Sequence, residues 1–322
     1  IVDVGSWRMK VVMINDCAYV GETLIKYLPE DFEVLHLKRC RRFFDKTFGI
    51  AWKILRSEGD IYHVHYLLQD CYLALKFGKH PIVGHAHGTD LRKTVNHRIF
   101  GRIVRYNLEK CDVILVSTPD ILEIAKEYNE NAKYLPNPVD TSIFYPKPPV
   151  ENESGKLNVL IAGKLDWKVK GSHVAVEALS KIKEYVKVYA IDYGRDVHKT
   201  MKLASSLGLH IHLLRKVSHS DVREYYWRAN VIIDQFPKSG TLGMVTLEAI
   251  ACGRPAIAYV SSKYAPYRDF PLKDLNTPEK VAEILLTEDL MDLWKQQYHY
   301  LVECHEPHKI AEKVRQIYMQ LV

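Results

Sequence analysis

The segment SGTLGMVTLEAIACGRPAIAY, residues 239–259, contains one carboxylate, Glu248, among small and apolar residues. Charged side chains are almost never fully buried unless they are paired, and burying an unpaired polar group costs roughly 2–7 kcal/mol. The run NVIIDQF predicts a buried strand, and PKSGTLG after it predicts a turn. MVTLEAIAC then predicts a helix closed by Gly253, and RPAIAYV predicts the next strand. Glu248 therefore lies about one turn into a helix of a strand–turn–helix–strand unit.

The rest of the chain repeats this alternation of short apolar runs and helix-period segments, which is typical of parallel βαβ units. A single core rarely grows beyond about 250–300 residues, so 322 residues indicate two domains. Residues 144–156 are rich in proline and polar residues and predict a linker. We expect an α/β protein with two doubly wound domains, residues 1–145 and 146–303, and a C-terminal helix in 304–322 that packs back on the first domain.

The composition excludes several classes of protein. With 47% hydrophobic and 26% charged residues the chain is typical of a soluble globular protein. No apolar run reaches the roughly 18 residues of a membrane span, and the first residues show no signal-peptide pattern, so we expect a cytoplasmic protein. The net charge of +6 is spread over both halves, which argues against nucleic acid as a partner.

Several familiar motifs are absent from the sequence. The six cysteines form no CxxC pair, so we expect neither a disulfide framework nor a zinc site. There is no GxGxxG, no GxxxxGK[ST] and no DxD, so the usual signatures of dehydrogenases, P-loop proteins and metal-bound nucleotide-sugar sites are missing.

The turn before the helix that carries Glu248 is suited to an anion. Glycines at 240 and 243 leave backbone N–H groups uncovered at the helix N-terminus, where the partial positive charge favours a diphosphate. A carboxylate slightly further along could accept hydrogen bonds from ribose hydroxyls, as in dinucleotide-binding folds. The alternative is a glutamate on the wet face of its helix, which is the commoner role of a lone glutamate, but the glycine-rich turn and apolar helix favour the ligand interpretation.

These residues resemble glycosyltransferase family four, whose pattern is roughly E-G-F-G-x-x-x-x-E-A-M-A-x-G-x-P-V-I, against G-T-L-G-M-V-T-L-E-A-I-A-C-G-R-P-A-I here. The first glutamate of that pattern falls on Gly240, and Asp234 with Gln235 upstream resembles a variant subgroup. The resemblance implies a GT-B fold, two Rossmann-like domains facing an interdomain cleft, and a retaining, metal-independent glycosyltransferase without a cofactor that uses a UDP- or GDP-sugar. It also implies that Glu248 binds the donor ribose and that the amides of Thr241, Leu242, Gly243 and Met244 face the donor sugar and phosphate.

Weaker resemblances supply the other candidate residues. LIAGKLDWKVKG is similar to the family's G-R-L-x-x-x-K-G, which implies that Lys164 and Lys170 neutralise the diphosphate, although either lysine alone is more often solvated surface. The H-G-x-D context in HAHGTD implies that His87 faces the sugar; His63, His65 and His85 are interpreted as core or turn residues. The remaining implied donor contacts are Val217 near the base and Gly21 near the phosphates, with His87 and Lys170 the implied catalytic residues.

A basic segment and two rival functions complete the predictions. Residues 37–56 interleave cations with bulky apolar side chains, which suits peripheral contact with an anionic inner membrane face; a solvated amphipathic helix is an equally good interpretation. The acceptor is then a glycan or a lipid-linked molecule.

Two rival functions stay open. One is a non-catalytic subunit that binds nucleotide or sugar, because Gly240 replaces a glutamate. The other is a different GT-B enzyme, such as a nucleotide-sugar epimerase or a sugar phosphorylase.

Overall fold

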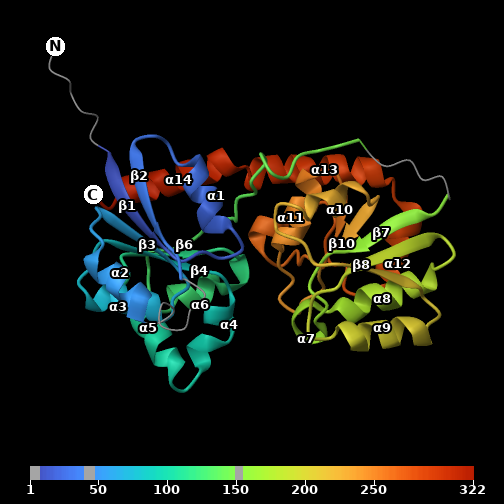
Figure 1. Ribbon diagram of the computed structural model, residues 1–322, viewed down its shortest axis with the longest axis horizontal. Coiled ribbons are helices and arrows are strands. Elements are labelled where there is room, and N and C mark those ends of the chain that lie inside the picture. The colour runs from blue at the N-terminus through green and yellow to red at the C-terminus, as the bar shows by residue number, and fades with distance from the viewer. Residues whose placement is uncertain (1–7, 40–47, 149–154) are drawn as a thin grey trace, which may run out of the picture. The chain divides into compact units, whose positions relative to one another are not determined.

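The computed structural model describes residues 8–39, 48–148 and 155–322, which form two compact units (Figure 1). Unit 1 contains the described residues up to Pro138 together with Pro307–Val322, and unit 2 contains Val139–Glu306. Each unit is built on one parallel sheet with helices on both faces. The predicted fold class, two doubly wound α/β domains, is confirmed.

Unit 1 has a six-stranded sheet in the order β2-β1-β3-β4-β5-β6. Figure 1 shows α1 and α14 on one face of this sheet and α2, α3 and α5 on the other. The strands are β1 Met9–Ile14, β2 Phe32–Leu37, β3 Ile61–His65, β4 Ile82–Ala86, β5 Val113–Val116 and β6 Ala132–Tyr134; the helices are α1 Val20–Tyr27, α2 Ile50–Arg56, α3 Gln69–Lys76, α4 Thr89–Arg92, α5 Phe100–Lys110, α6 Leu122–Lys126 and α14 Pro307–Met319. Short 3-10 turns lie at Thr94–Asn96 and Pro119–Ile121.

Unit 2 has a five-stranded sheet in the order β11-β10-β7-β8-β9. Helices α10, α11 and α13 lie on one face, and α8 and α9 on the other, where α12 packs against α8 (Figure 1). The strands are β7 Leu157–Ile161, β8 Val186–Ile191, β9 Ile211–Leu214, β10 Val231–Ile233 and β11 Ala256–Ile257; the helices are α7 Trp167–Lys170, α8 Ser172–Lys181, α9 Val197–Ser206, α10 Arg223–Trp227, α11 Met244–Ala251, α12 Pro278–Thr287 and α13 Leu290–Cys304. A 3-10 turn lies at Ala265–Tyr267.

The boundary between the units falls after Pro138, whereas the sequence pattern predicts it after residue 145. Val139 and Phe144 are buried in the core of unit 2, where the ring of Phe144 packs against Tyr226 of α10 and the N–H of Val139 donates to the carbonyl of His305. The first part of the expected linker is also fixed there, since the buried guanidinium of Arg254 donates to the carbonyls of Lys147 and Pro148, both at 2.9 Å. The remainder of that linker, residues 149–154, lies outside the described residues.

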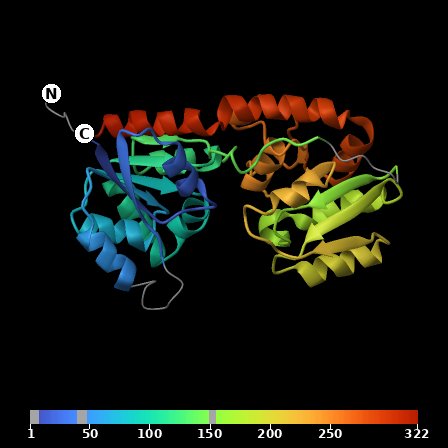
Figure 2. The ribbon, with the colours of Figure 1, turned by 45° about the horizontal axis from the view of Figure 1, so that its top comes forward.

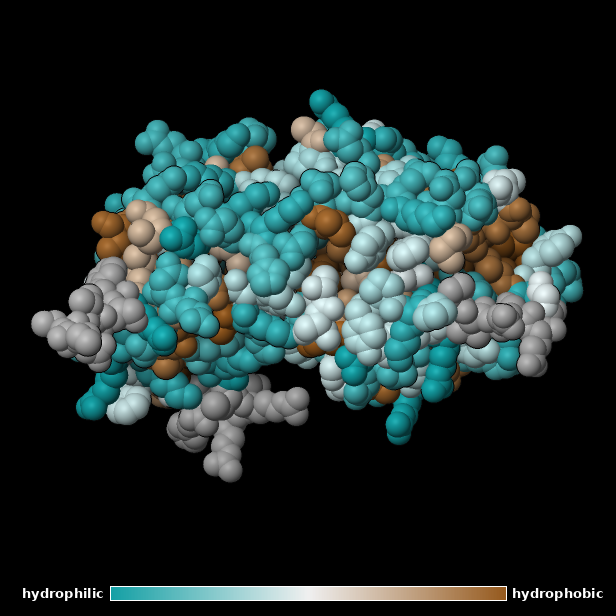
Figure 3. All heavy atoms as spheres, turned by 90° about the horizontal axis from the view of Figure 1, so that it is seen from above, coloured by the Kyte–Doolittle hydropathy of each residue, from teal (hydrophilic) through white to brown (hydrophobic). Residues whose placement is uncertain are grey.

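The last helix, α14, belongs to unit 1 although it follows the whole of unit 2 in sequence. Tyr318 is fully buried, and its hydroxyl lies 2.6 Å from Nδ1 of His63 on β3. Near the surface, Arg315 pairs with Asp31 at 3.3 Å. Figure 2 shows α14 lying along the sheet of unit 1, and most of the residues coloured in Figure 3 are hydrophilic.

None of the helices in the described ranges combines the length and the hydropathy that a membrane-spanning segment requires. Of the basic segment 37–56, residues 40–47 lie outside the described residues. The part that follows forms α2, whose Ile50 and Ile54 are buried against unit 1.

We expect Tyr318→Ala to destabilise unit 1 by about 3 kcal/mol or more, because it removes a fully buried aromatic ring. Tyr318→Phe should cost about 1 kcal/mol, the worth of one hydrogen bond to His63. The measurement is urea unfolding combined with hydrogen exchange of the β3 amides. Met319→Ala is the matched control, because that side chain is 52% exposed; unchanged β3 exchange in Tyr318→Ala would contradict the packing role of α14.

Candidate functional site

The turn between β10 and α11 depends on two glycines. Gly240 has a left-handed φ of 59°, and a Cβ at this position would lie 2.6 Å from Cβ of Ser261. Gly243 is the N-cap of α11, and its Cβ would lie 2.4 Å from Oδ2 of Asp234. The position that carries the first glutamate of the family pattern therefore has neither the backbone conformation nor the space for a side chain.

The N-terminus of α11 has unpaired backbone donors. Within the described chain, the N–H groups of residues 241–245 donate to no protein acceptor, whereas the N–H of Thr246 donates to Oδ2 of Asp234 at 3.2 Å. The hydroxyl of Thr246 donates to the same oxygen at 2.8 Å, and the other oxygen, Oδ1, is buried without a hydrogen-bond partner among the described residues. Asp234 thus anchors the third residue of the helix and leaves the amides before it available to an anion.

Glu248 lies inside unit 2 and is only 3% exposed. Its Oε1 lies 2.7 Å from Nε2 of His219, and the hydroxyl of Tyr226 donates to Oε2 at 3.2 Å. Burial raises the pKa of Glu248, the bonds from His219 and Tyr226 oppose that rise, and the net pKa is raised. The helix face that carries Glu248 is therefore not its wet face, and two polar side chains that the sequence analysis did not single out pair with the carboxylate.

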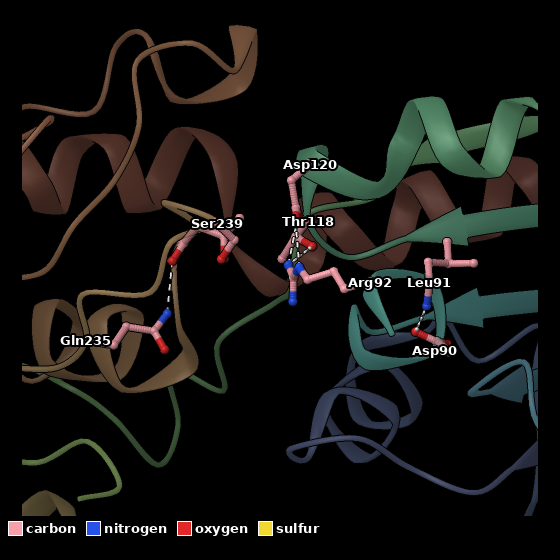
Figure 4. Close-up of polar contacts among 8 residues, drawn as sticks. Asp90, Leu91, Arg92, Thr118, Asp120, Gln235 and Ser239 are labelled. Atoms are coloured by element: carbon pink, nitrogen blue, oxygen red, sulfur yellow. Dashed lines mark hydrogen bonds and ion pairs between the residues drawn. The ribbon is translucent and has the colours of Figure 1, made fainter. Parts of the chain in front are cut away.

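Lys170, at the end of α7, is connected to the same turn through Gln235. Its ammonium donates to Oε1 of Gln235, and Nε2 of Gln235 donates to the carbonyl of Thr241 at 2.9 Å. Figure 4 shows Gln235 pointing toward the segment that carries Ser239. The structure thus brings together Lys170, the neutral amide of Gln235 and the glycine turn.

The other predicted residues of unit 2 are less closely connected. Lys164 is exposed, with its ammonium 5.4 Å from the ring centre of Tyr193. Val217 is half-buried in the loop that joins β9 to α10. Leu242 is buried in the core and Met244 packs against that core, so any contact that these two make with a ligand would come from their backbone.

In unit 1, His87 follows the end of β4 and joins a cluster of four imidazoles. Its Nε2 lies 2.8 Å from Nδ1 of His65, and Nε2 of His63 lies 3.1 Å from Nδ1 of His85. Burial, followed by the neighbouring imidazoles, lowers the pKa of His87. His63, His65 and His85 are fully buried, as expected of core residues, but their hydrogen bonds to one another and to His87 were not foreseen.

The loop after His87 is held by Arg92, which forms two bonds to the carboxylate of Asp120 and one to the hydroxyl of Thr118 (Figure 4). Gly88 has a φ of 102°, and a Cβ there would lie 2.2 Å from the guanidinium of Arg92. The loop therefore has a fixed backbone beside the candidate histidine.

Gly21 lies in the first turn of α1, and its environment explains why it is a glycine. A Cβ here would lie 3.0 Å from Nε2 of His65 and 3.1 Å from Oδ1 of Asp16. The N–H of Gly21 already donates to Oδ1 of Asp16 at 2.8 Å. Its role toward the donor phosphates stays a prediction, and the structure shows Gly21 packing against the histidine cluster.

A cavity of about 530 Å³ opens at the carboxyl ends of β1, β2 and β3 in unit 1, the edge at which open α/β sheets bind ligands. Its centre is Asp70, which accepts two bonds from Arg39 at 2.5 and 2.7 Å and one from Asn15 at 2.5 Å. No sequence motif indicated this cavity, because its residues come from three separate loops and from the first turn of α3. It is lined by Asn15, Asp16, Lys38, Arg39, Tyr66, Leu68, Gln69 and Asp70.

Comparisons with known proteins agree with this arrangement. The family model "Glycosyltransferase Family 4" matches residues 22–143, and the model "Glycosyl transferases group 1" matches residues 147–267, so that the two together span most of the chain. The chain belongs to glycosyltransferase family 4. In this family 4 chain, the second match includes the whole β10–α11 turn and Glu248.

Two curated relatives are similar over part of their length. One is the N-acetyl-alpha-D-glucosaminyl L-malate synthase of Bacillus anthracis, 25% identical over 219 residues, which are 63% of this chain and 57% of the relative. The other is an uncharacterized glycosyltransferase of Methanocaldococcus jannaschii, 28% identical over 235 residues, or 70% and 64% of the two chains. This family 4 chain thus spans less than two thirds of either relative.

A solved structure extends the similarity of fold to nearly the whole chain. The crystal structure of Anabaena HepE in complex with UDP and glucose has a TM-score of 0.74 and 13% identity, and the match covers 98% of this chain and 100% of that one. The predicted GT-B fold of this family 4 chain is confirmed.

The glycine at 240 can be tested by substitution. We expect Gly240→Ala to lower the free energy of unfolding of unit 2 by about 2 kcal/mol or more, because the left-handed φ is strained for alanine and the new Cβ overlaps Ser261. Gly155→Ala is the matched control: its φ is 69°, but no atom of the described residues lies within 4 Å of the added Cβ, so it should cost only about 1 kcal/mol. Equal losses in urea unfolding would show that Ser261 does not restrict position 240.

Proposed function

We propose that this chain transfers a sugar from a UDP- or GDP-sugar to an acceptor hydroxyl, with retention of the anomeric configuration and without a divalent metal. The observation that carries the proposal is that one helix, α11, combines two features. The amides at its N-terminus have no acceptor among the described residues, and a buried carboxylate follows one turn later. Family membership and the UDP complex of the Anabaena structure support a nucleotide-sugar donor.

The diphosphate of the donor binds at the start of α11. Amides of residues 241–245 supply donors, and the partial charge of the helix N-terminus adds to them. Lys170 supplies a full positive charge, and its partner Gln235 is neutral, so the charge is not cancelled within that pair. These groups stabilise the negative charge that develops on the leaving diphosphate, which is the principal electrostatic task of the transfer. Lys164 adds a second cation from the loop after β7.

The ribose of the donor binds at Glu248. An ionised carboxylate offers about four lone-pair sites, of which His219 and Tyr226 use two. His219, whose side chain is 21% exposed, is the more accessible of these two partners, and it shares or releases Oε1 when ribose hydroxyls arrive. Val217, two residues before His219, borders the nucleobase.

The reaction needs no metal in this account, because Lys170 and the helix N-terminus supply the positive charge. His87 contacts the donor sugar, and the acceptor hydroxyl attacks from the face that the diphosphate leaves. Retention of the anomeric configuration and the hexosyl nature of the sugar are proposed from the family resemblance. The identity of the donor base, uracil or guanine, is to be determined by nucleotide titration.

The acceptor, a glycan or a lipid-linked molecule, binds in the cavity of unit 1. Carboxylate, guanidinium and amide groups meet at Asp70, Arg39 and Asn15, and such planar groups form paired hydrogen bonds with neighbouring hydroxyls. Tyr66 adds an aromatic face to the same cavity, which suits the apolar side of a sugar ring.

Contact with an anionic membrane remains part of the proposal, through α2 and Phe48, which precedes it. Phe48, Trp52 and Leu55 are 74%, 56% and 52% exposed, and the guanidinium of Arg56 lies 4.7 Å from the ring centre of Trp52. An exposed apolar and cationic helix suits an anionic bilayer surface. The protein would then act at the cytoplasmic face of the membrane.

A non-catalytic nucleotide- or sugar-binding subunit is the second candidate function, and the structure of Gly240 favours it over an epimerase. No side chain fits at that position, so a family contact to the donor sugar is missing. Binding of the donor without any product, in the presence of varied acceptors, would support this alternative.

Calorimetric titration with UDP, GDP and ADP in EDTA tests the donor site. We expect one nucleotide to bind wild type and Glu248→Gln to weaken that binding about tenfold or more, because one or two hydrogen bonds to the ribose are lost. Lys170→Met should weaken binding similarly through the diphosphate. Glu184→Gln and Lys168→Met, at exposed positions of the same unit, are the matched controls. Absence of binding by wild type would contradict the proposed donor site.

Vesicle sedimentation tests the membrane contact. We expect the full chain to bind vesicles that contain anionic phosphatidylserine more tightly than neutral vesicles, and the double variant Phe48→Ser/Trp52→Ser to lose most of that binding. Tyr185→Ser, at a 64% exposed position of unit 2, is the control for loss of an exposed aromatic side chain. Equal binding of wild type and the double variant would exclude α2 as the contact.

A further inference from the structure

Four of the histidines of unit 1, His63, His65, His85 and His87, form two separate hydrogen-bonded pairs. His63 and His65 lie on the same face of β3, and His85 with His87 lies on the adjacent β4 segment. The hydroxyl of Tyr318 bonds to His63 and His63 bonds to His85, while the ring of His65 bonds, among the described residues, only to His87. The rings of His65 and His87 are stacked with centres 5.1 Å apart and an interplanar angle of 15°.

His87 is the member of this cluster that reaches the surface. Its ring is half-buried, and the distance between ring centres is 4.3 Å to His85 and 5.3 Å to Tyr66. Nε2 is used in the bond to His65, and within the described chain no hydrogen bond is made to Nδ1. Any ligand of this ring therefore meets Nδ1.

Both imidazoles of the His65–His87 pair are neutral near pH 7, because burial, followed by the neighbouring imidazoles, lowers the pKa of each well below its usual value. A neutral imidazole has one N–H donor and one bare acceptor nitrogen, and the partner of one nitrogen decides which form is present. The bond between Nδ1 of His65 and Nε2 of His87 contains one proton. If Nδ1 of His65 carries that proton, Nε2 of His87 is bare and the proton of His87 is on its Nδ1.

The far side of His65 decides between the two forms. Its Nε2 is buried with no hydrogen-bond partner among the described residues, and the backbone of Gly21 packs against it. A proton on Nε2 would leave a buried donor unpaired, at the full cost of its desolvation. A bare Nε2 instead faces the Cα of Gly21, whose C–H is a weak donor. The proton of His65 is therefore on Nδ1, where it is used in the bond to His87.

We propose that His65 is a positioning residue that holds His87 in the form protonated on Nδ1, so that His87 presents a hydrogen-bond donor to an oxygen of the bound sugar donor. The role of His87 toward the sugar rests on the proposed function; the protonation pattern of the pair does not. In this form His87 stabilises an oxygen and does not act as a base. Gly21 contributes to this arrangement. Because it has no side chain, its backbone packs directly against Nε2 of His65 and offers no acceptor for a proton there.

A metal ion is the other occupant that this cluster suggests, since ligand atoms of His63, His65 and His85 lie within 4.8 Å of one another. The hydrogen bonds argue against it. His63 already uses both nitrogens, one with Tyr318 and one with His85, and a metal would have to break the second bond.

Nitrogen-15 NMR of the full chain labelled at histidine tests the proposal without any need for activity, because protonated and bare ring nitrogens have well separated shifts. We expect His65 and His87 to be protonated on Nδ1 and bare on Nε2, with the signals assigned by His65→Leu and His87→Ala. In His65→Leu the signals of His87 should change to a mixture of the two forms. His65→Asn, which keeps an N–H donor close to the position of Nδ1, should preserve the wild-type pattern of His87.

Three results would overturn the proposal: a proton on Nε2 of His87 in wild type, an unchanged His87 pattern in His65→Leu, or a tightly retained metal ion that shifts the His63 and His85 nitrogens. In a transfer assay, His65→Leu should lower kcat about tenfold, the worth of one hydrogen bond, with a smaller change in the donor KM, and His65→Asn should recover most of the rate. Failure of the proposed transfer with an intact NMR pattern would reject the function of His87 and leave the role of His65 standing.

Discussion

A buried carboxylate must be paired, and this constraint shapes the second half of the molecule. Glu248 is placed inside unit 2 by the apolar helix α11, and it is satisfied by His219 and Tyr226, which come from the loop after β9 and from α10. The same helix is preceded by the N-cap Gly243, its first amides have no acceptor among the described residues, and its third residue is held by Asp234. The fold thus places a buried hydrogen-bond acceptor and a helix N-terminus a fixed distance apart, and we propose that a nucleoside diphosphate binds to both.

Unit 1 uses another kind of constraint, the need to satisfy several buried imidazoles without charging them. Alternate positions of β3 and the end of β4 bring four rings together, and Tyr318 of α14 completes one of the two hydrogen-bonded pairs. Helix α14 is therefore hydrogen-bonded to the histidine cluster that includes His87. This dependence explains why a helix so far from β3 in sequence belongs to unit 1.

Local patterns were enough to predict much of the fold. Short apolar runs, the glycine at 253 and the proline-rich linker predicted the parallel sheets, the end of α11 and the existence of two domains. They did not reveal that Val139 and Phe144 belong to unit 2, because an apolar residue in a connection does not show which core it enters. Glu248 was recognisable from its apolar surroundings, but His219 and Tyr226 were not, since their loop and helix meet α11 only in the tertiary structure. The cavity around Asp70 was missed for the same reason, and the hydrogen-bond pairing of the histidines depends on the register of β3 and β4.

The central claim, that α11 binds a nucleoside diphosphate with its N-terminal amides and its buried carboxylate, is tested most directly by a crystal structure of the chain with the nucleotide that binds it. The account predicts phosphate oxygens within hydrogen-bond distance of the amides of residues 241–245 and both ribose hydroxyls on the carboxylate of Glu248. A nucleotide bound elsewhere, or a ribose that leaves Glu248 paired only with His219 and Tyr226, would contradict it.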